Sequence, residues 1–330
     1  MDTAVRFTHP ADAAKLLHAV LTDHPQSWMA SSEGPLDVQA TTVLREHTGS
    51  RLALRYAIRW GKVERILIAK FYARDRSDVA STLSSLLTRG FGPGQPMQVP
   101  TLIAYVPEIG LLLMEEAPGQ TARVALRHGQ SGIGERTAQW LAAFHAAATP
   151  LPAAYQLREP VSRARRWAQR LNVNAPALGA EAHYLLAALI DAQPAWPPQP
   201  RLVHGDFSIS HVYVAAETTT VIDWDSWAVG DCAEDAGRFM ASLHHLTARD
   251  PERYICSRQA ARSFAQTYLA LVPMARQSLA FYEALACLRT ATRLTARLVP
   301  RRVRYAQAML AAGTLALTRA CTSAELLPNQ

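Results

Sequence analysis

The segment from Leu202 to Phe239, LVHGDFSISHVYVAAETTTVIDWDSWAVGDCAEDAGRF, constrains the fold more than any other part of the 330-residue chain. An apolar pair opens it and is followed directly by His-Gly-Asp, which ends at Asp206. The alternation over 211–214 predicts a short strand. After a polar turn, a second apolar pair leads into Asp223. Two carboxylates therefore lie at opposite ends of a predicted β-hairpin.

Asp206 and Asp223 have a functional and a structural interpretation. Carboxylates held close together on rigid strand ends are what Mg²⁺-dependent chemistry requires. A single Asp in such a place commonly does no more than start a turn. The whole constellation of the two carboxylates and the His-Gly-Asp sequence favours the functional interpretation.

This pattern resembles the aminoglycoside phosphotransferase and choline kinase group of small-molecule kinases, which are relatives of the protein kinases. In that group His-Gly-Asp is followed by an Asn five residues after the Asp, an apolar strand and Ile-Asp-Trp/Phe. The resemblance implies that Asp206 is the catalytic Asp that orients the acceptor hydroxyl and that Asp223 binds Mg²⁺. The tail G-D-P-x-x-D-x-x-x-F is also matched over 230–239, with Cys232 at the Pro position.

The chain departs from this group at the metal-binding Asn, where it has His211. Mg²⁺ prefers oxygen ligands in octahedral geometry, and an imidazole nitrogen is a poorer ligand for it than an amide oxygen. Three outcomes are open: His211 binds a softer ion such as Mn²⁺, it contacts a phosphate when protonated, or the second metal site is lost. We expect Asp223 and His211 to be the metal ligands, with Mg²⁺ or Mn²⁺ as the ion.

Three alternating segments upstream, 38–45, 52–59 and 65–72, predict a β-meander with one buried face. Lys70 ends the third strand in the context Leu-Ile-Ala-Lys, which resembles the kinase strand whose Lys contacts the nucleotide α- and β-phosphates. The first turn has the place of the Gly-rich phosphate loop, but it contains a single Gly. Ser50 in this turn is a candidate phosphate contact, and a plain hairpin turn is the alternative.

The helix predicted over 77–89 lacks the Glu that kinases pair with the strand Lys, which leaves Asp78 as the candidate partner of Lys70. The sequence LLLMEEAPG over 111–119 resembles the connector between kinase lobes. There the extended backbone of Glu115 and Ala117 is expected to present polar groups to the adenine of ATP or GTP.

Beyond the connector, helical periodicity dominates. Helices are expected over 135–149, 161–171, 180–191, 235–246, 251–271, 274–299 and 302–318. The expected fold is α+β, a two-lobed protein-kinase-like fold. Residues 1–117 would form an N-lobe with a small antiparallel sheet that binds the nucleotide, and residues 118–330 a helical C-lobe with the catalytic loop and the acceptor pocket. His145, in Leu-Ala-Ala-Phe-His, is expected to be structural rather than a ligand.

Composition supports a globular protein, with 49% hydrophobic and 18% charged residues. The formal charge of +7 suits a nucleotide, and no recognition-helix pattern points to nucleic acid. The chain lacks a signal peptide pattern and any apolar run long enough to cross a membrane. The four cysteines show no C-x-x-C spacing and are expected to be reduced and buried. These features together predict a cytoplasmic location.

Arg289, Arg293 and Arg297 recur at four-residue spacing and predict a basic stripe on one helix. A solvated face is the ordinary interpretation, and a site for a ligand with a phosphate or carboxylate is the alternative. Because cationic antibiotics need an acidic acceptor pocket, the stripe argues against an aminoglycoside acceptor.

The predicted function is ATP-dependent phosphoryl transfer to a hydroxyl of a small molecule, such as a sugar, an aminoglycoside-like compound or an amino alcohol. The first alternative is a catalytically silent, kinase-like nucleotide-binding protein (a pseudokinase). The second is a metal-dependent phosphohydrolase, whose candidate ligands are His204, Asp206, His211, Asp223 and Asp225.

Overall fold

The computed structural model describes residues 2–31, 34–147, 159–197, 199–297 and 299–325. The chain forms two compact units. The first comprises Met1–Pro118 together with Thr220–Ile222, and the second comprises Gly119–Thr219 and Asp223–Gln330.

The first unit is built on a five-stranded sheet with the order β1-β2-β3-β6-β5, in which every neighbouring pair is antiparallel. Its strands are β1 (Leu36–His47), β2 (Arg51–Trp60), β3 (Val63–Tyr72), β5 (Leu102–Val106) and β6 (Leu111–Glu115). In β2, alternate residues such as Leu54, Tyr56 and Ile58 are buried, as the meander predicted. The sheet is therefore confirmed, with strand ends that differ from the prediction by a few residues.

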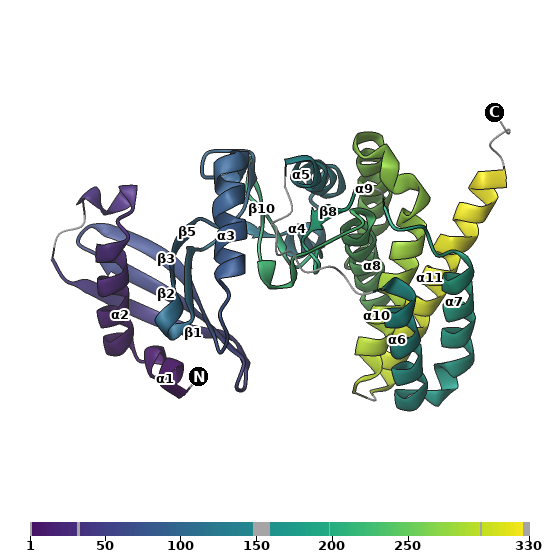
Figure 1. Cartoon of the computed structure of the whole chain (residues 1–330), viewed down its shortest axis with the longest axis horizontal. Helices are drawn as coiled ribbons and strands as arrows, with labels where there is room; N and C mark the ends of the chain where they lie inside the picture. Colours follow the sequence, from purple (N-terminus) through teal and green to yellow (C-terminus); the bar gives the residue numbers. More distant parts are fainter. Residues whose placement is uncertain (1, 32–33, 148–158, 198, 298, 326–330) are drawn as a thin grey trace. The chain divides into compact units, whose positions relative to one another are not determined.

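Helix α2 (Pro10–Asp23) packs beside β1 and covers the buried face of the sheet (Figure 1). Its side chains Leu17 and Leu21 are fully buried in the same core as Phe71. The Tyr56 hydroxyl donates a hydrogen bond of 2.9 Å to the carbonyl of Phe7, which ties the N-terminal segment to the sheet. The first unit also contains α1 (Asp2–Val5), α3 (Ser77–Leu86) and β4 (Met97–Gln98).

Helix α3 ends earlier than the sequence predicted. The α-helix gives way to a π-helical turn over Leu87–Phe91, in which Gly90 has a φ of 93°. A left-handed residue cannot continue an α-helix, so the predicted extension to Arg89 is wrong.

The second unit is mainly helical. Its helices are α4 (Ala122–Arg127), α5 (Ile133–Ala147), α6 (Pro160–Asn174), α7 (Gly179–Asp191), α8 (Ala233–Arg249), α9 (Ser257–Leu271), α10 (Leu279–Thr295) and α11 (Pro300–Glu325). Short strands accompany them: β7 (Gln120–Thr121), β8 (Arg201–Val203), β9 (Val212–Val214) and β11 (Ala228–Gly230). Strand β10 (Thr219–Val221) begins in the second unit and continues into the first. Strand β7 pairs antiparallel with β9, and β8 with β11.

Helix α10 is the centre of this unit and packs against α6, α8 and α11 (Figure 1). It is shorter than the predicted helix over 274–299, because Pro273 opens a separate 3-10 turn and the helix ends at Thr295. Arg297 therefore lies beyond the helix, and the predicted stripe is not continuous. Helix α9 likewise begins at Ser257 rather than 251, and the last two residues of the helix predicted over 135–149 lie outside the described residues.

Cys232 and Cys287 are free and buried as predicted, whereas Cys256 is half-buried. In the described part of the chain, no helix combines the length and the apolar character needed to cross a membrane.

Candidate active site

The loop between β8 and β9 is held in place by Asp235 of α8. One carboxylate oxygen of Asp235 accepts a hydrogen bond of 2.6 Å from the His204 backbone N–H, and the other accepts one of 2.9 Å from the Gly205 N–H. Asp235 is fully buried, so two charge-assisted hydrogen bonds to one carboxylate fix the backbone just before Asp206. Asp231 accepts from the Ala233 N–H at the start of α8. Both residues thus fasten the loop and the helix.

Gly205 is required by the geometry of this loop. Its φ is +75°, and a Cβ built on it would lie 2.0 Å from the Ser226 carbonyl oxygen. Any side chain would force apart the two segments that carry the acidic residues. The next residue, Asp206, donates its backbone N–H to His204 Nδ1 at 3.2 Å. His204 therefore supports the loop from a fully buried position, where it packs 4.8 Å from the Trp224 ring.

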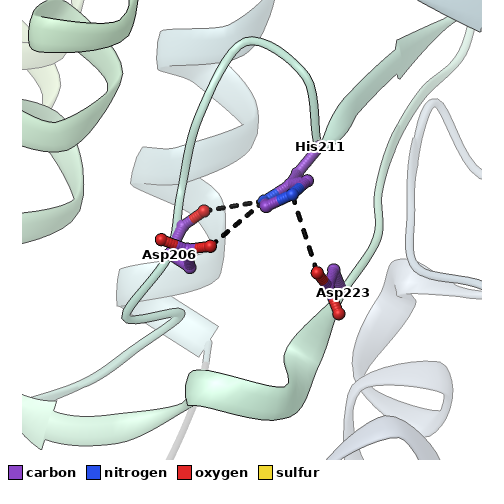
Figure 2. A group of neighbouring side chains, drawn as sticks. All are labelled: Asp206, His211 and Asp223. Atoms are coloured by element: carbon purple, nitrogen blue, oxygen red, sulfur yellow. Dashed lines mark hydrogen bonds and ion pairs between the residues drawn. The ribbon is translucent and has the colours of Figure 1, made fainter. Parts of the chain in front are cut away.

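His211 faces both acidic residues (Figure 2). Its Nδ1 lies 2.8 Å from the backbone carbonyl oxygen of Asp206, which can only accept a hydrogen bond. Nδ1 therefore carries a proton, and a neutral ring leaves the lone pair on Nε2, which lies 3.6 Å from Asp223 Oδ2. A carbonyl on one ring nitrogen is the usual way to orient the other nitrogen toward a metal.

Asp223 follows β10 in an unusual backbone conformation. Its φ of 67° and ψ of 62° are left-handed, and no other non-glycine residue in the described ranges has a positive φ. Asp tolerates this region better than most residues, at a cost in free energy. The left-handed turn ends the strand and starts the 3-10 helix Trp224–Ser226.

The geometry brings three predicted site residues together. One ligand atom from each of Asp206, His211 and Asp223 can be chosen so that all three lie within 4.8 Å of one another (Figure 2). All three side chains are partly exposed, between 21% and 28%. Two carboxylate oxygens with one imidazole nitrogen form a donor set that fits Mn²⁺ well and Mg²⁺ less well. His204 is not part of this cluster. The phosphohydrolase alternative, in which His204 is a candidate metal ligand, therefore gains no support from it.

Two arginines from neighbouring helices reach the same oxygen of Asp206. Arg289 Nη1, from α10, donates a hydrogen bond of 3.1 Å to Asp206 Oδ1. Arg238 Nη1, from α8, lies 3.9 Å from that oxygen. Arg238 also donates to Glu234, which in turn accepts two hydrogen bonds, of 2.7 and 2.8 Å, from Arg163. The site thus has a basic side as well as the cluster of candidate metal ligands.

His145 is structural, as predicted. Its ring nitrogens lie 2.9 Å from the Tyr268 hydroxyl and 3.3 Å from Asp235. Tyr268 also donates to the Cys232 carbonyl, so this buried group braces Asp235, the residue that holds the β8–β9 loop.

The four predicted nucleotide-binding residues lie in the first unit. Lys70 is on β3, paired in register with Ala53 and Leu112. Ser50 closes the β1–β2 turn, because its backbone N–H donates a hydrogen bond to the His47 carbonyl. Gly49 in the same turn has a φ of +72°.

Glu115 ends β6, and Ala117 is buried just beyond it. The expected Lys70–Asp78 ion pair remains a prediction, and Asp78 accepts two hydrogen bonds from Arg76.

Sequence reasoning did not identify Arg238 as a site residue and did not connect Arg289 with Asp206. Arg238 carries one available signal, because it lies inside the matched tail, between Asp235 and Phe239. The contact between Arg289 and Asp206 spans 83 positions, and no local pattern reports it.

Several solved structures share this fold. A choline kinase from Cryptosporidium parvum Iowa II aligns with a TM-score of 0.61 at 11% identity, covering 94% of this chain and 97% of its own. A choline/ethanolamine kinase family protein from Mesorhizobium loti aligns with a TM-score of 0.57 at 14% identity, covering 94% and 99%. The aminoglycoside phosphotransferase APH(4)-Ia, in a ternary complex with ADP and hygromycin B, aligns with a TM-score of 0.59 at 16% identity, covering 85% and 95%.

No curated protein sequence matches the chain. The similarity to solved structures confirms the predicted α+β, kinase-like fold. The profile of the phosphotransferase enzyme family matches residues 43–272, which is well over half of the sequence. The chain therefore belongs to the phosphotransferase enzyme family.

Proposed function

We propose that this protein is a small-molecule kinase that transfers the γ-phosphoryl group of ATP or GTP to a hydroxyl of its acceptor. The observation that carries the proposal is the convergence of ligand atoms of Asp206 and His211, on the braced β8–β9 loop, and of Asp223, after β10, within 4.8 Å of one another. Phosphoryl transfer needs mainly positioning and charge neutralisation, so a small set of rigidly held groups suffices.

In this proposal Asp206 accepts the proton of the acceptor hydroxyl. A bond forms between the acceptor oxygen and the γ-phosphorus, the bond from that phosphorus to the β,γ-bridging oxygen breaks, and the nucleoside diphosphate leaves. Asp223 and His211 Nε2 are the proposed ligands of a divalent ion, which would neutralise phosphate charge. Lys70, Ser50, and the backbone of Glu115 and Ala117 are the proposed nucleotide contacts. A cytoplasmic location stays a prediction.

The first experiment measures thermal stability with ATP or GTP in the presence of Mg²⁺ or Mn²⁺. We expect nucleotide to raise the melting temperature, and more strongly with Mn²⁺, because His211 offers a nitrogen ligand. The variant His211→Asn restores an amide oxygen and should shift the preference toward Mg²⁺. His128→Asn, at an exposed position, is the matched control. If no nucleotide stabilises the protein under any of these conditions, the proposal fails.

The second experiment measures phosphoryl transfer to a panel of hydroxyl compounds. Asp206→Ala should lower kcat by roughly 10²–10⁴-fold, the usual contribution of a positioned general base. Full activity in that variant would contradict the proposed role of Asp206.

A pseudokinase is the second candidate, and two observations favour it. Arg289 donates a hydrogen bond to Asp206, and α3, with the sequence SDVASTLSSL, contains no Glu. Nucleotide binding without transfer to any acceptor, in a protein otherwise folded and metal-loaded, would select this candidate.

A further inference from the structure

Arg238 and Arg289 form a basic pair beside Asp206 that the proposed kinase chemistry does not use. Their guanidinium groups come from α8 and α10 and approach the same carboxylate oxygen, Asp206 Oδ1, at 3.9 and 3.1 Å. A single arginine on one helix could be an ordinary surface charge. Here two arginines on two different helices converge on the same atom, which is typical of a binding site.

Arg238 has an unsatisfied donor at this point. Its side chain is only 10% exposed, and Nε and Nη2 both donate to Glu234. Nη1 is buried and has no hydrogen-bond partner among the described residues. A buried charged donor without a partner is costly, and such groups are commonly completed by a ligand or by water.

The carboxylates near Arg238 and Arg289 do not neutralise both arginines. Glu234 is shared by two arginines. It accepts hydrogen bonds from Arg238 and two further hydrogen bonds from Arg163. A second buried carboxylate, Glu283, lies on α10, the helix of Arg289. Its Oε1 lies 2.6 Å from His244 Nε2. Within the described ranges, Asp206 is the carboxylate that both Arg238 and Arg289 approach. In the proposed reaction it must be free to accept a proton.

Further arginines lie around a later part of α8. His245 lies two turns beyond Arg238 on α8, and its pKa is lowered to about 4 by burial and by nearby arginines. These are Arg249 of α8, Arg293 of α10, Arg123 of α4 and Arg302 of α11. This part of the second unit is therefore positively charged, which would repel a cation and attract an anion.

We propose that the acceptor is an anionic hydroxyl compound, whose carboxylate or phosphate group is bound by Arg238 and Arg289 beside Asp206. Guanidinium groups suit both anions, because they donate in a planar fork that matches carboxylate and phosphate oxygens. When the anion binds, Arg289 exchanges Asp206 for the acceptor, Arg238 Nη1 gains its missing partner, and Asp206 Oδ1 becomes available to the acceptor hydroxyl. This inference rests on the proposed kinase function for the identity of the acceptor.

The first test measures binding alone, by calorimetry on the full chain without nucleotide. The probes are inorganic phosphate and D-glycerate, with glycerol as the neutral comparison. We expect Arg289→Gln and Arg238→Gln each to weaken binding of both anions about tenfold or more, the scale of a lost charge-assisted hydrogen bond. Asp206→Asn should strengthen anion binding, because it removes the carboxylate that competes for Arg289.

Arg297→Gln is the matched control, since it removes the same charge from an exposed position beyond the end of α10. An equal loss of affinity in this control would reduce the effect to net charge and overturn the inference. Because Arg238→Gln disturbs the partners of Glu234, Arg238→Lys is the second variant. It keeps the charge and loses the forked geometry, so it should still bind phosphate more weakly than the wild type.

The second test separates this inference from the proposed function. Phosphoryl transfer is measured with anionic acceptors (gluconate, glycerate, sugar phosphates), neutral ones (glucose, glycerol) and cationic ones (hygromycin B, spectinomycin). We expect preference for the anionic group, and a KM raised about tenfold or more by Arg289→Gln for these acceptors in particular. Preference for cationic acceptors overturns the inference and leaves the kinase function intact. If no acceptor is phosphorylated while anion binding still depends on both arginines, the kinase function fails and the anion site stands.

Discussion

Charged side chains at the centre of the second unit alternate in sign, from Arg163 through Glu234 and Arg238 to Asp206 and Arg289. Glu234 is the most deeply buried carboxylate of this series. Burial alone would raise its pKa, but the charges of Arg238 and Arg163 outweigh burial and hold the pKa of Glu234 below its ordinary value. Glu234 is therefore ionised in the folded protein and fixes the position of both arginines.

We predict that Glu234→Gln destabilises the protein by about 3–5 kcal/mol, because it leaves two buried cations without their shared anion. Urea unfolding would measure this change. Glu252→Gln, at an exposed position, is the control and should change the free energy of unfolding by less than about 0.5 kcal/mol. An equal effect of both substitutions would contradict the prediction.

The interaction of Glu234 with Arg163 and Arg238 also makes the free energy of unfolding depend on pH. Since the folded-state pKa of Glu234 is lowered, its contribution is complete above the unfolded-state pKa and is lost as pH falls through the lower, folded value. The wild type should therefore lose stability in acid more steeply than Glu234→Gln. Urea unfolding would show this difference. It should be measured at a series of pH values that starts at about 6 and extends below the ordinary Glu pKa of about 4.3.

The residue scale also marks the limit of prediction from sequence. Asp206, His211 and Asp223 could be singled out, because a short motif with fixed spacing carries them. The partners of Asp206 could not, since an Arg is unremarkable in a helix until the packing of α8 and α10 shows which way it points. Arg289 was recognised only as part of a stripe, and the structure separates it from exposed Arg293 and Arg297.

At the scale of elements, the close packing of α8 on α10 positions the β8–β9 loop that carries Asp206. A Cβ on Gly237 would lie 2.4 Å from the Tyr282 carbonyl carbon, so this glycine allows the two helix backbones to approach closely. Gly237 is two residues after Asp235, which holds the loop. The same contact therefore sets the place of Asp206, and the distance between the helices that carry Arg238 and Arg289.

We expect Gly237→Ala to destabilise the protein by about 1–3 kcal/mol through overpacking, despite the better helix propensity of Ala. Gly313→Ala on α11 is the comparison. There the nearest atoms are Leu185 Cδ2 at 3.0 Å, Cys287 Cβ at 3.1 Å and the Ala284 carbonyl oxygen at 3.3 Å, so the overlap is much smaller than at Gly237. Thermal unfolding of both variants would decide, and a larger loss in Gly313→Ala would contradict this reasoning.

Element types followed from periodicity, and element ends followed less well. The strands of the meander and most helices could be predicted because apolar residues recur with periods of two and 3.6. The ends near Gly90 and Pro273 depend on a left-handed glycine and a 3-10 turn, and α9 begins at Ser257 only after turns over 251–256. The place of α10 at the centre of its unit is a tertiary fact that no helical pattern contains.

At the scale of the molecule, three residues belong to a different unit from their neighbours in sequence. Thr220–Ile222 lies within the first unit, whereas Thr219 and Asp223 belong to the second. Thr220 and Val221 are buried, and the Thr220 hydroxyl lies 3.5 Å from the Gln98 side chain of the first unit. The two units are therefore not separable by one cut in the chain.

We predict that a fragment of residues 119–330 unfolds at a lower urea concentration than the full chain, because it exposes the side chains of 220–222 that the first unit buries. Circular dichroism in urea would measure the midpoint. Co-expression with residues 1–118 is the control and should recover the solubility and the midpoint. An isolated fragment as stable as the full chain would contradict the prediction.

The left-handed backbone at Asp223 restricts which substitutions can be used to study the site, and which could arise there. Only a short side chain that tolerates a φ of 67° fits, so Glu is disfavoured by conformation although it keeps the carboxylate. Ala at this position would combine loss of the proposed metal ligand with strain in the turn that begins Trp224–Ser226. Asn and Gly keep the turn and remove the charge, which makes them the informative replacements. At position 223 the backbone and the chemistry therefore select the same residue.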